Sequence, residues 1–273
     1  MKKLITVSDW ANDSLNCQEF RTVVEGYLKD TAGVNAGFVF STPSTIHTSF
    51  LISQVVATEE EYGRPQETVI FQNTDPRLQA DEAIEKAEGA EFLIARLKSG
   101  IFICGPNAGY AFSLVKSKID ELFHYENLNK ESQFRSRDIY ARVCAHLMDE
   151  MEDELDLEEG SMELLPELRG YFVGHIDSFG NIKTTIVQEE LKGKYEYGDM
   201  INVKINGVEK KARFVDTMFS GKLGELVIYP GSSGIKNNPY LEISVWRHFT
   251  EKDISTGTHS FNNPRPGTEI HLV

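Results

Sequence analysis

The sequence is short of cysteine, of long apolar runs and of positive charge, and each shortage excludes a class of protein. Its three cysteines are widely spaced and form no zinc or redox pattern, so they are expected to be free thiols in a reducing cytoplasm. No apolar run approaches the length of a membrane span. Lys and Arg number 28 against 42 Asp and Glu, and the net charge of −14 disfavours non-specific binding to nucleic acid or anionic lipid.

Common catalytic motifs are missing as well. There is no Walker-type loop, no dinucleotide glycine fingerprint and no Gly-x-Ser-x-Gly elbow. The histidines are scattered without metal-ligand spacing, and His146 with Glu150 is better explained as a pair on a helix surface. We therefore expect no metal site. The segment Met1–Val7 turns polar too soon for a signal peptide and predicts a first buried strand, which favours a cytoplasmic protein.

What the sequence does contain divides it into two domains. Residues 1–150 alternate apolar strand-like runs with amphipathic stretches, which predicts an α/β domain with a largely parallel sheet and flanking helices. Residues 151–169 are expected to form an acidic linker; an EF-hand calcium loop is the minor alternative, although its glycine and ligand spacing is absent. Residues 170–273 show short β-branched or aromatic runs between turn residues, which predicts a small all-β, barrel-like domain.

The expected elements follow from these patterns. The strands expected in the first domain are Leu4–Val7, Gly37–Phe40, Thr68–Gln72, Phe92–Leu97 and Ile101–Cys104. Its expected helices are Phe20–Leu28, Ile46–Val56, Ala83–Ala87, Ser113–Phe123 and Ile139–Met148. The strands expected in the second domain are Tyr171–Ile176, Lys183–Val187, Ile201–Ile205, Lys211–Phe214, Glu225–Tyr229, Leu241–Val245 and Glu269–Val273. The pair Asn206-Gly207 predicts a tight hairpin.

The segment Asp177–Asn181 is the most informative stretch of the chain. Its Gly180 permits a backbone conformation closed to other residues, so a hairpin here could present Asp177, Phe179 and Asn181 together. A carboxylate, an aromatic ring and an amide suit a small ligand with a cationic end and a flat heteroaromatic end. The structural alternative is a β-turn in which the Asp and Asn side chains cap their own backbone.

Further polar loops follow expected strands, where ligands of α/β sheets usually bind. They are Ser8–Ser14, Asn73–Arg77, Gly105–Tyr110, Phe134–Ala141 and, in the β domain, Tyr229–Gly234. Each has a structural alternative: Asp9 or Asp13 could cap the following helix, and Pro76 and Pro106 could simply end an element.

Taken in order along the chain, these loops and the Asp-x-Phe-Gly-Asn turn resemble one family. It is the S-adenosylmethionine-cleaving family that contains the S-adenosylmethionine hydroxide adenosyltransferases (DUF62) and the fluorinating and chlorinating enzymes. The resemblance covers nearly the whole chain, and the turn is its most specific element. It implies a homotrimer with active sites between subunits, and a nucleoside substrate. It also implies metal-free attack of water, hydroxide or halide on the ribose C5′ with methionine leaving, and no cofactor besides the substrate.

The resemblance also implies which residues bind the ligand. Asp9 matches the aspartate that binds both ribose hydroxyls, and Asp13 lies near a second loop aspartate. Asp177 matches the carboxylate that faces the methionine ammonium, and Asn181 the amide that contacts adenine. Phe179 and Phe214 match aromatic rings that pack on adenine. Tyr229, Ser232 and Ser233 match the segment that holds the methionine end.

The catalytic positions depart from the family pattern. Asp75 is retained, but Arg77 begins a segment that replaces the glycine-rich continuation, and Glu82 stands roughly where an arginine is expected. Arg135 occupies the place of a histidine. Ser136 corresponds to a serine of the fluorinating members, yet the Asp75 carboxylate would repel a halide.

Three hypotheses follow for the function. The first is a divergent hydrolase that forms adenosine and methionine, in which Asp75 orients or deprotonates water and Arg77, Arg135 or Arg137 holds that aspartate. The second is a catalytically weakened binder or sensor of S-adenosylmethionine, adenosine or a related nucleoside. The third is a halide-dependent 5′-halo-nucleoside synthase, supported by Ser136.

Overall fold

The computed structural model describes residues 2–30, 34–74, 90–126, 132–247 and 255–273. It divides into an N-terminal unit, Met1–Leu168, and a C-terminal unit, Arg169–Val273. None of the helices in these described ranges is both long and apolar enough to cross a bilayer. The expected helix Ala83–Ala87 lies outside the described residues.

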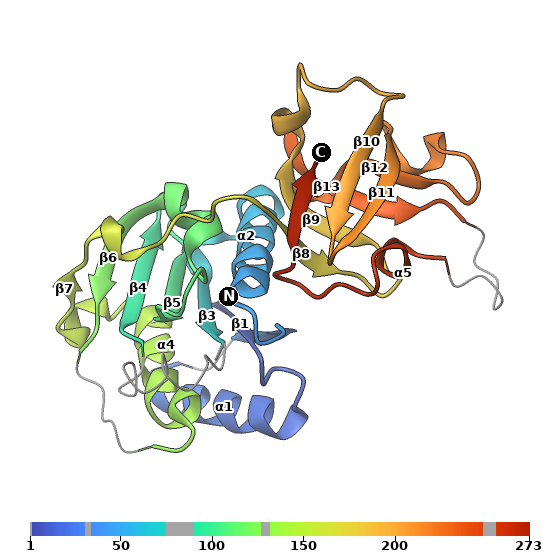
Figure 1. The fold of residues 1–273 in the computed structure, drawn as a ribbon. Helices are drawn as coiled ribbons and strands as arrows, with labels where there is room; N and C mark the ends of the chain where they lie inside the picture. Colours follow the sequence, from blue (N-terminus) through green and yellow to red (C-terminus); the bar gives the residue numbers. More distant parts are fainter. Residues whose placement is uncertain (1, 31–33, 75–89, 127–131, 248–254) are drawn as a thin grey trace, which may run out of the picture. The chain divides into compact units, whose positions relative to one another are not determined.

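The N-terminal unit is built on a mixed sheet with the strand order β2-β1-β3-β5-β4-β6-β7 (Figure 1). The strands are β1 (Lys3–Ser8), β2 (Asn35–Phe40), β3 (Thr68–Asn73), β4 (Phe92–Leu97), β5 (Phe102–Pro106), β6 (Ile119–His124) and β7 (Glu158–Glu159). The pairs β1/β2, β1/β3 and β3/β5 are parallel, whereas β4 runs antiparallel to both β5 and β6, and β6 antiparallel to β7. The α/β class is therefore confirmed, but the sheet is parallel only in part. A tight turn at Gly100, with φ +91°, joins β4 to β5, and so short a link permits only antiparallel pairing.

Helices cover both faces of this sheet. Alternation along β1 and β3 sends Leu4 and Phe71 to the face covered by α1 (Ser14–Tyr27) and α4 (Ala141–Met148). It sends Val7 and Ile70 to the face covered by α2 (Thr45–Tyr62), in line with the expected helical stretches. A π-helical turn, η3 (Ser136–Tyr140), leads into α4, and η1 (Pro65–Glu67) precedes β3.

The helix expected over Ser113–Phe123 is wrong in its second half. A 3₁₀ helix, η2 (Ser113–Lys118), is followed directly by strand β6, which pairs with β4. The buried residues Ile119 and Leu122 lie three positions apart, a spacing that imitates a helical face.

The acidic segment expected as a linker forms secondary structure and joins the sheet of the N-terminal unit. It forms η4 (Glu152–Leu155), β7 and η5 (Met162–Leu164), and β7 pairs with β6 at the edge of the sheet. Leu155 and Leu165 are buried in the two cores of the N-terminal unit. These apolar residues attach an otherwise acidic stretch to the sheet.

The C-terminal unit is a closed barrel with the order β10-β11-β12-β13-β9-β8-β14, which confirms the expected all-β, barrel-like architecture. Its strands are β8 (Tyr171–Ile176), β9 (Ile182–Val187), β10 (Met200–Ile205), β11 (Val208–Phe214), β12 (Leu226–Ile235), β13 (Asn238–Val245) and β14 (Glu269–Leu272). Its short helices are η6 (Gln188–Leu191), η7 (Met218–Ser220) and α5 (Gly257–Ser260). Asn206 and Gly207, both at positive φ, form the expected hairpin turn between β10 and β11.

Candidate functional site

The turn between β8 and β9 holds the first group of candidate residues. The Asp177 carboxylate accepts hydrogen bonds from the backbone N–H of Phe179 at 2.9 Å and of Asn181 at 3.0 Å. Its second oxygen accepts from the Asn181 amide at 2.9 Å. The turn therefore caps its own backbone, as the structural alternative required, and this capping fixes the orientation of the carboxylate and the amide.

A close approach to the N-terminus of α5 fixes the same turn from outside. Gly180 has φ +78°, and a Cβ atom there would lie 2.8 Å from the Cβ of Thr256. The N–H of Thr258 donates to the Gly180 carbonyl at 3.0 Å. On the other side, the Ser244 hydroxyl of β13 donates to the Asn181 side-chain oxygen. A glycine is required here both for its conformation and for its size.

A buried ion pair lies across neighbouring strands beside this turn. Lys183 on β9 and Glu242 on β13 are direct cross-strand partners, and their ammonium and carboxylate atoms are 2.7 Å apart. The backbone N–H and hydroxyl of Ser232 donate to the same Glu242 oxygen at 2.8 and 3.0 Å, and the Tyr229 hydroxyl donates to the other at 3.1 Å. Gly231 leaves room for this carboxylate, because a Cβ atom there would lie 2.3 Å from the Glu242 Cγ.

The protonation states at this network follow from burial and charge. Burial alone would raise the pKa of Glu242, but the Lys183 ammonium and the hydrogen bonds from Ser232 outweigh it and hold that pKa below its usual range. Burial raises the pKa of the Tyr229 phenol, and the Glu242 carboxylate raises it further. Burial and the charge of Lys183 lower the pKa of His175. Near neutral pH, Glu242 is therefore ionised while the phenol and the imidazole are neutral.

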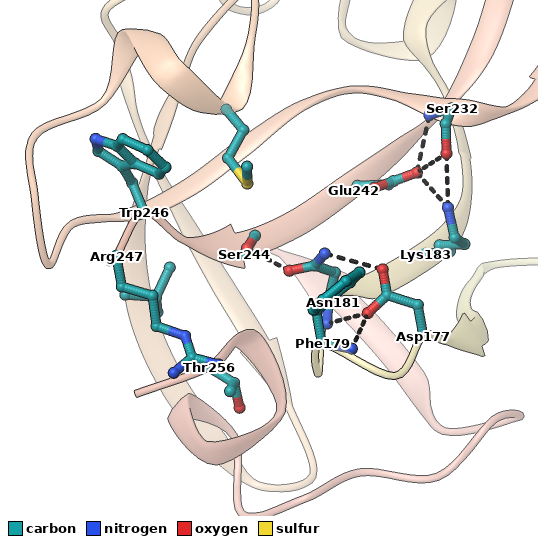
Figure 2. A pocket seen from close by; sticks show the side chains of 12 residues that line it. Asp177, Phe179, Asn181, Lys183, Ser232, Glu242, Ser244, Trp246, Arg247 and Thr256 are labelled. Carbon is teal, nitrogen blue, oxygen red and sulfur yellow. Dashed lines mark hydrogen bonds and ion pairs between the residues drawn. The ribbon is translucent and has the colours of Figure 1, made fainter. Parts of the chain in front are cut away.

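These residues line a cavity of about 320 Å³ in the barrel unit. Figure 2 shows Asp177, Lys183, Ser232 and Glu242 together on one side of it; we call this group the charged end. The opposite side, the indole end, carries Trp246 and Arg247 (Figure 2). Asn181, Phe179 and Ser244 lie between the two ends (Figure 2). The cavity thus offers charges at one end and an aromatic wall at the other, with an amide between them.

The expected binding residues of the barrel fall into two groups. Asp177, Phe179, Asn181 and Ser232 line the cavity. Three others lie outside its lining: Phe214, Tyr229 and Ser233. Phe214 is buried in the barrel core, where its ring lies 4.7 Å from that of Tyr197. Tyr229 reaches the cavity indirectly, through its hydrogen bond to Glu242.

The N-terminal unit brings three expected residues together at the carboxyl ends of β1 and β3. The Asn73 carbonyl accepts from the N–H of Asp9 at 3.4 Å and from the Ser8 hydroxyl at 2.6 Å. The Asn73 amide donates to the buried hydroxyl of Ser136 at 2.5 Å. Asp9 and Ser136 therefore meet through Asn73, where parallel strands end and loops can line a site.

Other expected residues of this unit serve the local structure. Asp13 is the N-cap of α1 and accepts from the N–H groups of Leu15 and Asn16. Arg137 forms ion pairs with Asp138 at 2.6 Å and with Glu19 at 3.0 Å. The exposed Arg135 hydrogen-bonds the hydroxyl of Tyr140.

Three expected residues, Asp75, Arg77 and Glu82, lie outside the described residues. Among the residues that are described, no group of three or more His, Cys, Asp or Glu side chains is arranged to hold a metal ion.

Two comparisons with known proteins concern S-adenosylmethionine enzymes. The model of the SAM hydroxide adenosyltransferase C-terminal domain matches residues 172–248, the part of the chain that carries the cavity. A protein of Methanocaldococcus jannaschii named (R)-S-adenosyl-L-methionine hydrolase is 30% identical over 172 residues. The C-terminal unit of the chain is thus similar to the C-terminal domain of the SAM hydroxide adenosyltransferases. The aligned region covers 56% of this chain and 57% of that relative's length.

Solved structures share the fold of this chain. A crystal structure of an uncharacterized conserved protein from Thermotoga maritima matches with a TM-score of 0.69 at 19% identity. The match covers 98% of this chain and 99% of the T. maritima chain. A conserved hypothetical protein from Thermus thermophilus matches over 100% of both chains, with a TM-score of 0.64 at 17% identity. At these identities the likeness concerns the fold alone.

Sequence reasoning missed several residues that line the cavity. They include Lys183, Glu242, Trp246 and Arg247. Two charged residues within otherwise apolar β-runs were the available signal, because a buried charge requires a partner. The signal did not say which strand supplies that partner, since Lys183 and Glu242 are 59 positions apart.

Proposed function

We propose that this chain binds S-adenosylmethionine and hydrolyses it to adenosine and methionine. The barrel cavity carries this proposal, because its charged end and its indole end lie on either side of Asn181. S-adenosylmethionine has a zwitterionic amino-acid end, a sulfonium and a flat heteroaromatic base. In the proposed pose Asp177 faces the ammonium, Asn181 the adenine edge and Trp246 the face of the ring. The match of residues 172–248 to the SAM hydroxide adenosyltransferase C-terminal domain and the name of the M. jannaschii relative support the same substrate.

The proposed reaction is a single displacement at the ribose C5′. The water oxygen forms a bond to C5′ while the C5′–S bond breaks, and its electron pair moves to sulfur, so that methionine leaves as a neutral thioether. The proton of water passes to Asp75 or to solvent. Positive charge is dispersed in this transition state, so an aligned and poorly solvated nucleophile matters more than an acid on the leaving group. Asp9 holds the ribose hydroxyls, as the resemblance implies.

A catalytically weakened binder is the second candidate, and one observation favours it. Arg137 is held by Glu19 and Asp138, and Arg135 is bonded to Tyr140, so two of the three arginines proposed to support Asp75 have other partners. Hydrolysis then depends on Arg77 or on a change of these contacts. For either candidate we infer a homotrimer with each site completed by a neighbouring subunit, as in the family resemblance.

The test is a time course of purified full-length protein with S-adenosylmethionine, with and without chloride, and with adenosine and methionine measured by chromatography. We expect both products at equal rates without halide. Asp75→Asn should lower the turnover rate at least about 100-fold, a usual contribution of a general base, without weakening binding. Asp120→Asn, an exposed carboxylate on β6, is the matched control.

Each other outcome decides against hydrolysis in its own way. Binding without either product would favour the binder. A 5′-halo-nucleoside formed with chloride alone would favour a halide-dependent synthase. Absence of binding would refute a role for S-adenosylmethionine altogether.

A further inference from the structure

We propose that Lys183 recognises the α-carboxylate of the ligand and thereby selects nucleosides whose 5′ substituent ends in a complete α-amino acid. This inference rests on the proposed function and names a specificity determinant within it. The lysine side chain is 14% exposed, and it lines the charged end of the cavity.

The first argument is the unused donor of this lysine. Its ammonium donates to Glu242 at 2.7 Å and to the Ser232 hydroxyl at 2.8 Å. An ammonium carries three N–H donors, and within the described part of the chain these two bonds are the ones that it makes. The third donor is available to an anionic group in the cavity, and the cation has already been desolvated and oriented by its two protein partners.

The second argument is that the charge of Glu242 is already paired within the protein. Its carboxylate accepts from the Lys183 ammonium, from the Ser232 N–H and hydroxyl, and from the Tyr229 hydroxyl. Three of these donors share one oxygen, and the Tyr229 hydroxyl bonds the other. Glu242 therefore acts as a fixed partner that holds Lys183 in place, and a ligand ammonium is better matched by a second carboxylate.

Asp177 supplies that acceptor. One of its oxygens takes two backbone N–H groups, whereas the other takes the single bond from Asn181, which leaves room for one more donor. The charged end thus offers one open acceptor and one open donor (Figure 2). This pair complements an α-ammonium and an α-carboxylate on the same ligand. It does not complement an amine alone, which would leave the Lys183 donor unpaired.

The other cation in the cavity lining is excluded by its position. Arg247 lies at the indole end, beyond Asn181 as seen from Lys183 (Figure 2). A ligand whose base lies against Trp246 therefore directs its amino-acid end to Lys183. Arg247 provides a matched control, because it is a cation in the same cavity at the wrong end.

The experiment compares S-adenosylmethionine with its decarboxylated analogue, which differs by the carboxylate alone. Dissociation constants are measured on the full-length protein by rapid mixing before turnover, with the fluorescence of Trp246 as the signal. We expect the wild type to bind the carboxylate-bearing ligand about 10–100-fold more tightly, the value of a charged hydrogen bond. Lys183→Met should remove this preference by weakening S-adenosylmethionine alone, and Arg247→Gln should keep it.

A second variant controls for misfolding of Lys183→Met. Lys183→Met leaves the Glu242 carboxylate buried without its cation, whereas Lys183→Met/Glu242→Gln leaves no unpaired charge, and it should lose the preference equally. Equal affinities in the wild type would overturn the inference, as would a preference that survives both Lys183 variants or disappears in Arg247→Gln. Adenosine formation without a carboxylate preference would overturn this inference alone, and binding of neither ligand would overturn the proposed function with it.

Discussion

The charged end of the barrel and the carboxyl edge of the N-terminal sheet differ in how their polar groups are used. In the barrel, Lys183 and Glu242 neutralise each other across two strands and line a cavity. At the sheet edge, Ser136 is buried against Asn73, and Asp13 caps a helix. The barrel keeps polar groups directed at a cavity, whereas the N-terminal unit uses most of its candidate residues to complete its own structure.

The difference has a physical cause in the two folds. A closed barrel fixes the direction of every side chain through its two-residue period, and a buried charge there must be paired by a neighbouring strand. The sheet edge is made of loops, in which Asp, Asn and Ser side chains bond to the nearest backbone. This difference is consistent with the proposed function, in which the barrel supplies the binding of the amino-acid end.

The largest effect is expected from breaking the ion pair of the barrel. Glu242→Leu leaves the Lys183 ammonium buried and unpaired, and it removes the acceptor of Ser232 and Tyr229. Removing one partner of a buried pair costs about 3–5 kcal/mol, so we expect a loss of that size in the free energy of unfolding, measured with urea. Glu269→Gln, whose partner His271 is exposed on β14, should change it by less than about 1 kcal/mol. Similar losses in the two variants would show that the pair is not effectively buried.

A smaller effect is expected from two glycines with nearly the same backbone conformation. Gly180 has φ +78° and Gly207 has φ +75°, but a Cβ atom meets Thr256 at the first and nothing within 4 Å at the second. Gly207→Ala should cost about 1–2 kcal/mol of unfolding free energy through backbone strain alone. Gly180→Ala should cost about 1–3 kcal/mol more through the contact and should also weaken ligand binding.

The comparison between these two alanine variants isolates the contact that positions Asp177 and Asn181. Equal losses would mean that α5 yields easily and does not hold the turn. An unchanged ligand affinity in Gly180→Ala would separate the turn from the cavity and would count against the proposed pose.

The sequence predicted those elements in which local pattern and tertiary role agree. The barrel strands and the Asn206-Gly207 turn followed from alternation and turn chemistry, both of which act between near neighbours. Strand β6 was missed because Ile119 and Leu122 imitate a helical spacing, and its pairing with β4 is set by tertiary contacts. The antiparallel half of the sheet follows from the short link at Gly100, which the strand pattern alone did not reveal.

The candidate site was predictable where one local segment carries it. Asp177, Phe179 and Asn181 belong to a single turn, so their proximity follows from five consecutive residues. Lys183 and Glu242 meet through the register of β9 and β13, which no local pattern contains. Phe214 is a different case, since its place in the motif order predicts a ligand contact that stays a prediction, and its ring is buried in the core.

The smallest effect on stability is expected from variants of Asp13. These variants distinguish a structural role of its carboxylate from a role in ligand binding. Asp13→Ala removes the cap of α1 and should lower the free energy of unfolding by about 1 kcal/mol, whereas Asp13→Ser retains a capping oxygen and should restore most of it. The serine variant lacks the carboxylate, so adenosine formation per folded molecule distinguishes the two roles. If Asp13 serves the helix alone, Asp13→Ser turns over at the wild-type rate. A serine variant that is stable but slow would instead assign the carboxylate to the ligand, and the sheet edge would then resemble the barrel in keeping a charge for binding.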